Sequence, residues 1–318
     1  MGTIAYRASD NSLFVNSHDQ DPMCVGHFGP IPTDLGGTAT VPVLERFWGR
    51  VPRDPAHDTA SAMKLHGLQW DEQNQRLCAT ETIWYNVSNQ DSLDAGCIHA
   101  DGTVDGPWEL GSNNLIAGPI AREANGRYLI GVTGVPGAAN ANFGPGAFDV
   151  DFTASSPALA LMTHRYDPPA IDTREKMSKG QPWFTSMPAT GSAVVDGTLL
   201  WAVSEGEVEF YGAGCTANPP LGNSFQELYG FAPRSCAKGY HHDHYHPKLY
   251  FYSLADLEAV RAGQKLPSDV HPYTYVPLEP SVPVQSFLGE LDVDTAGRRI
   301  FLASPIQQAG VRIYVYRY

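Results

Sequence analysis

Hydrophobic and polar positions alternate in a pattern that returns five times along the chain. The stretches 2–17, 66–81, 118–133 and 289–304 each begin with a small or polar residue, enter a short alternating strand, pass a polar turn and carry Leu or Ile eleven positions after the start. A fifth stretch, 191–205, has a shorter turn. Alternation with a period of two around a polar turn predicts a β-hairpin in each case.

Most hairpins are followed by a further aromatic or aliphatic segment. These segments are 40–48, 158–166, 248–254 and 311–318, with a weaker one at 94–102. One such unit is a small sheet that cannot bury both faces alone, whereas sheets stacked around an axis can. We therefore predict an all-β, single-domain, five-bladed β-propeller over residues 1–318, with a β-sandwich or a six-bladed ring as the alternative. The helical pattern at 253–264, which Ser253 can cap, predicts one short surface helix.

Composition supports the all-β class and limits the kinds of partner that we expect. The chain contains 31 Gly and 25 Pro, as expected for many short strands joined by turns. A net charge of −13 repels phosphate backbones and anionic lipids, so we expect neither nucleic acid nor a membrane as a partner. We expect a monomer. No apolar run reaches the ~20 residues of a membrane-spanning helix, and no secretion signal is visible at the start.

The cysteines indicate an oxidising compartment. Cys215 and Cys236 bracket a segment rich in Pro, Gly and Asn, which predicts a disulfide-closed insertion at 215–236 and an extracytoplasmic or secreted protein. Cys78 and Cys97 can also pair if their strands adjoin. The partner of Cys24 stays open.

Four patches resemble a known family. The stretches 11–19 ("NSLFVNSHD"), 144–151 ("GPGAFDVD"), 253–279 and 311–318 resemble parts of a family of uncharacterised, mostly secreted bacterial β-propeller-like proteins. The resemblance implies the propeller fold and secretion, and it implies no activity. Where that family has an Arg-His pair after the fourth hairpin, this chain reads "VSEGEVEFYG".

The long connections predict where a site lies. In a propeller, the innermost strands all start at one face, and the connections 50–65, 134–150, 167–189 and 265–288 belong to that face. Long loops on a rigid scaffold commonly carry function. We therefore expect the site at this face, at the mouth of the axial channel.

Several titratable residues fall at that face. They are Ser17, His18, Asp19, His66, Glu81, Glu205 and Glu290, from hairpin starts and second-strand ends. Crowded carboxylates raise one another's pKa, which lets one act as an acid and another as a base. We assign Glu81 and Glu205 as acid and base, His66 as a base or metal ligand, and His18 and Asp19 as supporting residues. The alternative is a wet channel in which these groups bind only backbone and water.

Further residues suit a sugar or a metal. Stacking rings and amides come from Trp84, Tyr85, Asn140, Asn142 and Tyr211, although such residues also pack blades together. In "HHDHYH" (241–246), an extended backbone places alternate histidines on one face. We predict His242, His244 and Glu290 as ligands of a divalent cation, calcium or zinc, with an adventitious surface cluster as the alternative.

These observations favour an enzyme whose active site lies at the mouth of the axial channel. The leading hypothesis is an extracytoplasmic carbohydrate-active enzyme, a glycoside hydrolase or polysaccharide lyase, that acts on a small-molecule or polysaccharide substrate. The alternatives are a non-enzymatic propeller that binds glycans or proteins, and a metal-dependent lactonase-like hydrolase. The chain has no Gly-x-Ser-x-Gly elbow and no P-loop, which argues against serine esterase and nucleotide chemistry.

Overall fold

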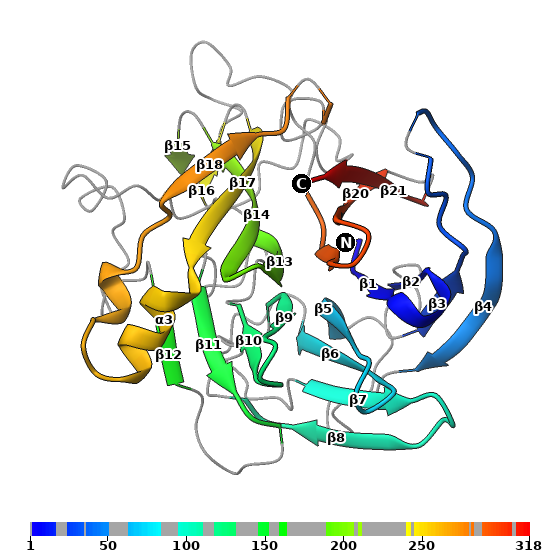
Figure 1. Cartoon of the computed structure of the whole chain (residues 1–318), viewed down its shortest axis with the longest axis horizontal. Helices are drawn as coiled ribbons and strands as arrows, with labels where there is room; N and C mark the ends of the chain where they lie inside the picture. Colours follow the sequence, from blue (N-terminus) through cyan, green and yellow to red (C-terminus); the bar gives the residue numbers. More distant parts are fainter. Residues whose placement is uncertain are drawn as a thin grey trace.

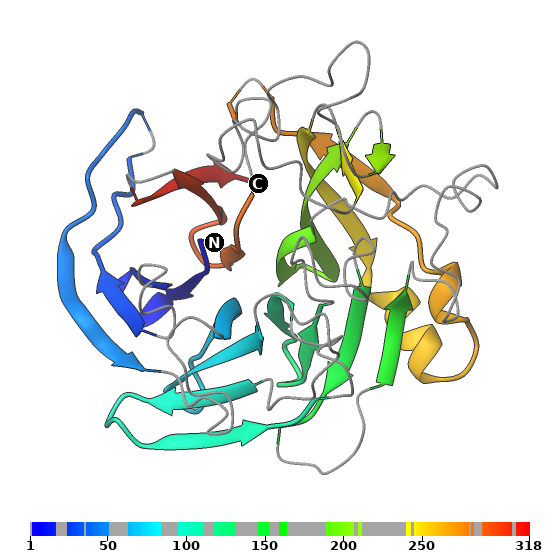
Figure 2. The same ribbon diagram turned by 180° about the vertical axis from the view of Figure 1, so that it is seen from behind.

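Five antiparallel sheets stand around one axis, as the repeated hairpins predict (Figure 1; Figure 2 shows the ring from behind). The computed structural model describes residues 2–16, 24–34, 36–50, 63–83, 95–110, 118–131, 146–152, 159–163, 189–206, 209–211, 240–242, 245–279, 281–282, 288–306 and 310–318. The chain is an all-β, five-bladed β-propeller with one α-helix among these residues. The alternatives of a sandwich and a six-bladed ring are wrong.

Each blade is a meander that runs outward from the axis. Blade 1 consists of β1 (Ile4–Arg7), β2 (Ser12–Asn16), β3 (Cys24–Phe28) and β4 (Val43–Arg50). Blade 2 consists of β5 (Met63–Asp71), β6 (Arg76–Ile83), β7 (Ala95–His99) and β8 (Val104–Trp108). Blade 3 consists of β9 (Ile120–Arg122), β10 (Tyr128–Ile130), β11 (Gly146–Val150) and β12 (Leu159–Thr163).

The remaining blades differ in their outer parts. Blade 4 consists of β13 (Ala189–Val195), β14 (Thr198–Gly206), β17 (Tyr245–Ser253) and β18 (Thr274–Pro277). A two-stranded sheet, β15 (Glu209–Tyr211) and β16 (Tyr240–His242), falls between β14 and β17 in the chain. Blade 5 consists of β19 (Leu291–Asp294), β20 (Arg299–Ile306) and β21 (Gly310–Arg317). Two 3₁₀ turns, Ala8–Asp10 and Pro267–Asp269, complete the elements.

The inner strands form a closed ring. β1 contacts β5, β5 contacts β9, β9 contacts β13, β13 contacts β19, and β19 returns to β1. The last contact closes the propeller, because the backbone N–H of Glu290 donates to the carbonyl of Gly2 (2.8 Å). The aliphatic residues that mark the repeat, Leu13, Leu77, Leu129 and Ile300, are all buried between blades.

The helix binds two blades together. α3 (Leu254–Arg261) is shorter than the predicted 253–264, and Ser253 precedes it in extended conformation without a side-chain cap. Leu257 and Val260 are buried in the core shared with Leu161, so one face of the helix is not at the surface. At the end of the helix, Arg261 pairs with Glu123 and with Asp149 of blade 3, each at 2.7 Å.

The cysteine prediction is confirmed in part. Cys78 and Cys97 stand directly opposite each other on β6 and β7 and form a disulfide. Cys215 and Cys236, with the predicted insertion 215–236, lie outside the described residues. No helix in the described part of the chain is both long and apolar enough to cross a membrane.

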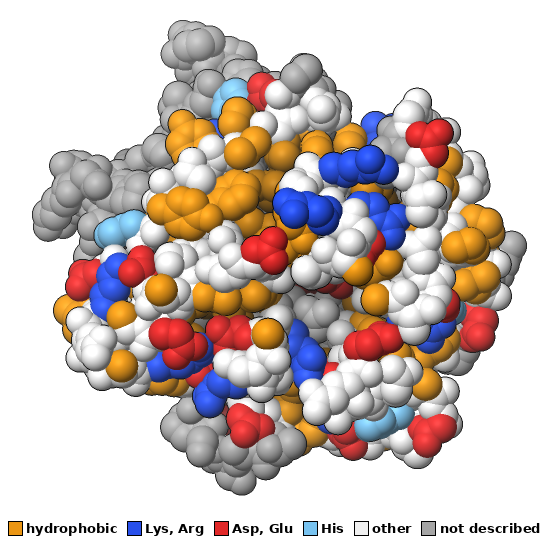
Figure 3. Space-filling model, in the orientation of Figure 1, with side chains coloured by type: hydrophobic (Ala, Val, Ile, Leu, Met, Phe, Trp, Pro, Cys, Tyr) orange, Lys and Arg blue, Asp and Glu red, His pale blue; other side chains and the backbone are white. Residues whose placement is uncertain are grey.

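Exposed aromatic rings gather at the outer edge of blade 4. Tyr273 and Tyr275 are largely exposed beside Val276, and Figure 3 shows apolar side chains collected over β18. The Lys248 ammonium lies 4.7 Å from the centre of the Tyr275 ring. β18 is the last strand of this sheet among the described residues, and it carries an apolar surface.

Glycine at the start of β13 is required by the close approach of blades 4 and 5. A Cβ at Gly191 would lie 2.5 Å from the backbone nitrogen of Leu291 and 2.7 Å from the carbonyl oxygen of Gly289. We expect Gly191→Ala to lower the free energy of unfolding by about 1–3 kcal/mol, because backbone cannot move aside as a side chain can. Urea unfolding measures this, and Gly37→Ala, whose Cβ would meet nothing within 4 Å, is the control. Equal stability of the two variants would contradict the tight approach.

Candidate active site at the propeller axis

The strand registers place the predicted catalytic positions on one rim. Leu65 on β5 pairs with Glu81 on β6, and Ala189 on β13 pairs with Val203 on β14. The starts of the inner strands therefore lie beside the ends of the second strands. His66, Glu81 and Glu290 fall on this rim, as the sequence predicts.

Glu290 reaches across the axis. Glu290 directly precedes β19 of blade 5, and the blades on either side of blade 5 are blades 4 and 1. Its Oε2 nevertheless accepts the backbone N–H of Leu68 in blade 2, at 3.0 Å. Because blade 2 is not a neighbour of blade 5, the carboxyl group must occupy the axis itself.

Burial changes the protonation of this carboxyl group. Glu290 has no exposed surface, and burial raises its pKa well above the usual value. The N–H groups of Leu68 and Ile120 lower this pKa in part, whereas the nearby carboxylate of Asp292 raises it. Burial therefore favours the protonated form of Glu290, which is the form that can give up a proton.

Asp292 is a second buried carboxyl group on the same strand face. Its Oδ2 accepts the N–H of Tyr6 in blade 1 (2.6 Å), and its Oδ1 accepts its neighbour's N–H, that of Val293 (2.7 Å). Burial raises the pKa of Asp292 to about 7, against the lowering effect of these two donors. β19 thus carries two titratable groups that face the inner strands around it.

Hydroxyl groups flank Glu290 on both neighbouring blades. Thr3 and Ser192 each follow a glycine at the position equivalent to Glu290 in the repeat, and both are buried. The Oγ1 of Thr3, the Oγ of Ser192 and the Oε1 of Glu290 find no hydrogen-bond partner among the described residues. Buried polar atoms of this kind indicate a ligand, an ion or ordered water.

His66 and Glu81 complete this end of blade 2. The register passes from Leu65–Glu81 to Gly67–Thr80, so His66 is the extra residue of a β-bulge. Bulges re-aim a side chain and are common next to active sites. Both His66 and Glu81 are buried.

Other predicted site residues are not placed. Ser17, His18, Asp19, Trp84, Tyr85, Asn140, Asn142 and His244 lie outside the described residues. Glu205, Tyr211 and His242 lie in β14, β15 and β16, but their side chains are not described. Their assigned roles stay predictions. Within the described part of the chain, no group of three or more His, Cys, Asp or Glu could hold a metal ion.

The sequence prediction missed Thr3, Ser192 and Asp292. The sequence contained a signal for two of them. The glycine that opens the repeat is followed by Thr3 in "GT" and by Ser192 in "GS", at the position that Glu290 occupies in its own repeat. Asp292 carries no such signal. Its alternation with Glu290 in "ELDVD" reads equally well as a solvent-facing pair.

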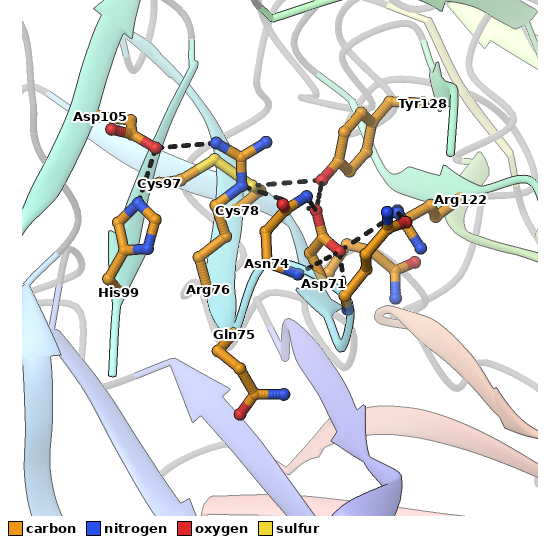
Figure 4. A network of polar contacts seen from close by, with 12 residues as sticks. Asp71, Asn74, Gln75, Arg76, Cys78, Cys97, His99, Asp105, Arg122 and Tyr128 are labelled. Carbon is orange, nitrogen blue, oxygen red and sulfur yellow. Dashed lines mark hydrogen bonds and ion pairs between the residues drawn. A yellow bond between two sulfur atoms is a disulfide. The ribbon is translucent and has the colours of Figure 1, made fainter. Parts of the chain in front are cut away.

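The opposite rim holds a charged network of a different kind (Figure 4). Asp71, at the end of β5, accepts hydrogen bonds from the hydroxyl of Tyr128 (2.6 Å) and the amide of Asn74 (2.7 Å) and pairs with Arg122 (3.2 Å). Burial opposes its ionisation, but these partners outweigh burial and lower the pKa of Asp71. The contacts of Asp71 with Tyr128 and Arg122 join blade 2 to blade 3.

The same arrangement recurs between blades 5 and 1. Asp294 ends β19, pairs with Arg299 five residues later (2.6 Å), and Arg299 donates to the hydroxyl of Tyr6 in the next blade (3.1 Å). An Asp, an Arg and a Tyr therefore fasten two pairs of blades at this rim. The opposite charges of these clusters neutralise one another, although the Nε of Arg122 and the Nη1 of Arg299 find no hydrogen-bond partner among the described residues. The axis at the other rim holds buried carboxyl groups without a paired cation, and it is the candidate active site.

Fold and site together define a β-propeller with acid groups on its axis. No family model matches the chain, and no curated protein matches its sequence. Solved structures do. A glycosyl hydrolase from Bacteroides ovatus is 7% identical with a TM-score of 0.48, covering 99% of this chain and 83% of that one. A GH43_1 enzyme from Xanthomonas citri is 9% identical with a TM-score of 0.45, covering 99% and 86%.

Another similar structure is a GH43_12 protein retrieved from the capybara gut metagenome. It is 10% identical with a TM-score of 0.44, and the match covers 99% of this chain and 50% of that chain. Similarity at this level says nothing about the activity of this chain. The resemblance to an uncharacterised secreted family finds support only in the propeller fold.

Proposed function

We propose that the protein is a carbohydrate-active enzyme, a glycoside hydrolase or polysaccharide lyase, whose acid–base groups lie on the propeller axis. One observation carries the proposal. Glu290 is a buried carboxyl group on the axis whose pKa is raised by burial, with an oxygen that has no partner among the described residues. A protonated carboxyl group beside a second carboxylate is the pair that acid–base cleavage of a sugar linkage requires.

The roles follow from the environments. Glu290 acts as the proton donor, because burial raises its pKa and so favours the protonated form. Glu81 acts as the base, and His66 in the bulge positions it or shares the proton. The hydroxyl groups of Thr3 and Ser192 suit hydrogen bonds to a polyhydroxylated ligand. Since neither carboxyl group is exposed, a substrate must displace the atoms that cover the axis.

The proposal includes an extracytoplasmic location. The Cys78–Cys97 disulfide supports an oxidising location, because such bonds persist outside the cytosol. The net charge of −13 favours neutral over anionic polymers as substrates. Neutral glycans are therefore the first candidates, with hydrolysis ahead of elimination.

A panel of polysaccharides and aryl glycosides tests the proposal. We expect the full chain to release reducing sugar from at least one neutral glycan, with chelator present or absent. Unsaturated products on a uronate polymer would indicate a lyase instead. Binding without turnover across the panel would favour the non-enzymatic propeller, and activity restored only by metal would favour the lactonase-like alternative.

A further inference from the structure

Two buried polar side chains stand opposite each other in the inner hairpin of blade 4. Ser192 on β13 pairs directly with Trp201 on β14, and each residue is 1% exposed. Directly paired residues of an antiparallel ladder stand on the same face, with Cβ atoms about 4.5–5.5 Å apart. The Oγ of Ser192 and the Nε1 of Trp201 both find no hydrogen-bond partner among the described residues. Two neighbouring donors therefore lack an acceptor.

The chemistry of these two groups defines what is missing. An indole N–H can only donate a hydrogen bond, whereas a serine hydroxyl can donate or accept. Buried polar atoms without a partner are rare in folded proteins, and they lower stability unless a ligand or ordered water pairs with them. One oxygen atom placed between the two side chains can accept from both. The pair thus indicates a site for an acceptor oxygen that the described residues do not supply.

The indole ring of Trp201 fills the junction between blades 4 and 3. It belongs to a core that includes Leu129 of blade 3 and Tyr250 of blade 4. The tip of the ring reaches blade 3, because a Cβ at Gly131 would lie 2.4 Å from its Cη2 atom. The N–H of Gly131 donates to the carbonyl of Pro119 (2.8 Å), so the ring touches blade 3 where its innermost strand starts.

This part of the junction borders the axial carboxyl group. Gly191 precedes Ser192, and a Cβ at Gly191 would lie 2.8 Å from the carbonyl carbon of Glu290. On the blade 3 side, the backbone N–H of Ile120 in β9 donates to the Glu290 carboxyl group. Ser192 and Trp201 therefore lie at the same rim as the proposed proton donor.

We propose that Ser192 and Trp201 form a subsite that binds one hydroxyl oxygen of a saccharide beside the axial acid. The inference rests on the proposed function and adds a determinant of specificity to it. Ligand sites combine apolar and aromatic walls with a few polar groups that fix orientation, as this junction does. When the ligand lacks the hydroxyl that such a site binds, the buried donors stay unpaired, so the subsite rejects a deoxy analogue.

Calorimetric titration with neutral hexasaccharides tests the subsite. The sugars are cellohexaose, xylohexaose, mannohexaose and maltohexaose, and the full chain carries Glu290→Gln to suppress turnover. In that background, Ser192→Ala and Trp201→Phe are each expected to weaken binding of the recognised sugar about 3–10-fold, as for one lost hydrogen bond. Trp70→Phe is the matched control and should bind as well as its parent, because the N–H of Trp70 already donates to Glu72.

A series of monodeoxy analogues then identifies the hydroxyl group. One analogue of the recognised sugar is expected to bind the Glu290→Gln protein at least about tenfold more weakly than the parent sugar. In the Ser192→Ala protein this difference should shrink, because one of the two donors that read the hydroxyl is gone. In the Trp70→Phe protein it should stay the same.

Stability without any sugar gives a second readout. Removing a hydroxyl that has no partner should leave the urea midpoint of Ser192→Ala unchanged or raise it. Ser12→Ala is the matched control, because Ser12 is also fully buried and its Oγ lies 2.7 Å from the Nε2 of His27. The urea midpoint of Ser12→Ala should fall.

Three results overturn the subsite. The first is a urea midpoint that falls as far in Ser192→Ala as in Ser12→Ala, which marks a hydroxyl held by the fold or by ordered water. The second is equal sugar binding with and without Ser192→Ala and Trp201→Phe. The third is no binding of any of the four sugars, which also counts against the proposed function, whereas the first two leave that function intact. If the melting temperature shows that Trp201→Phe is unfolded, Ser192→Ala decides.

Discussion

Replacing Glu290 with Gln is expected to lower turnover of the glycan identified in the panel by about 10²–10⁴-fold, the usual loss when a general acid is removed. The substitution keeps the size of the side chain and an oxygen that can accept the Leu68 N–H. It removes the only proton that the group can transfer. We expect kcat to fall more than KM rises, because the acid acts in the transition state.

Two comparisons sharpen this result. Glu81→Gln is expected to cause a loss of similar size, while Glu109→Gln, at an exposed position of blade 2, leaves the rate unchanged. Aryl glycosides with good leaving groups need less protonation, so they should recover part of the rate in Glu290→Gln and not in Glu81→Gln. Full activity in both Glu290→Gln and Glu81→Gln would contradict the assignment of these residues as acid and base.

Stability is expected to fall as the pH rises from about 4 to 7, and the axial carboxyl groups are the cause. Asp292 ionises near pH 7 in the folded protein, against 3.8 as its ordinary value, so the folded state binds more protons across this window. Unfolding free energy then drops by up to about 1.4 kcal/mol per pH unit for each such group, or on the order of 4 kcal/mol for Asp292. Glu290 acts in the same direction.

Glu290→Gln isolates the part of this effect that comes from Glu290, while Asp292 ionises in both proteins. The variant has no ionisable group at position 290, so its stability relative to the unchanged protein should improve as the pH rises above 4.5, the ordinary pKa of this side chain. Asp71 and Asp294 have lowered pKa values and act in the opposite sense, below about pH 4, in both proteins. Urea unfolding at several pH values gives the comparison. Parallel curves for the two proteins would show that Glu290 is ionised when folded.

Much of the fold could be predicted because the hairpin repeats in sequence. Period-two alternation and the buried position of Leu77 and its equivalents follow from local geometry, and they predicted the five blades. The roles assigned to His66, Glu81 and Glu290 stay predictions. The pairing of Cys78 with Cys97 followed once their strands adjoined.

The rest depends on distances across the ring, which no local pattern encodes. The Glu290 side chain accepts a hydrogen bond from Leu68 of blade 2, which is not a neighbour of blade 5. This contact depends on the width of the channel in a five-bladed propeller. Arg261 reads as an exposed helix residue until the helix packs on blade 3 and brings Glu123 within reach. Glu205 and His246 lie 41 positions apart in the sequence, and only the register shows that their backbone positions pair.

The closure of the ring has a consequence for biosynthesis. β1 pairs with β2 in its own blade and contacts β5 of the next one, but its contact with β19 comes nearly 300 positions later: Tyr6 and Asp292 are separated by 286 residues. During synthesis, blade 1 therefore lacks one of its two neighbouring blades until β19 has left the ribosome. Contacts of such long range slow folding and prolong exposure to aggregation. A circularly permuted chain that begins within blade 3 would make this junction early, and it should refold faster with fewer losses.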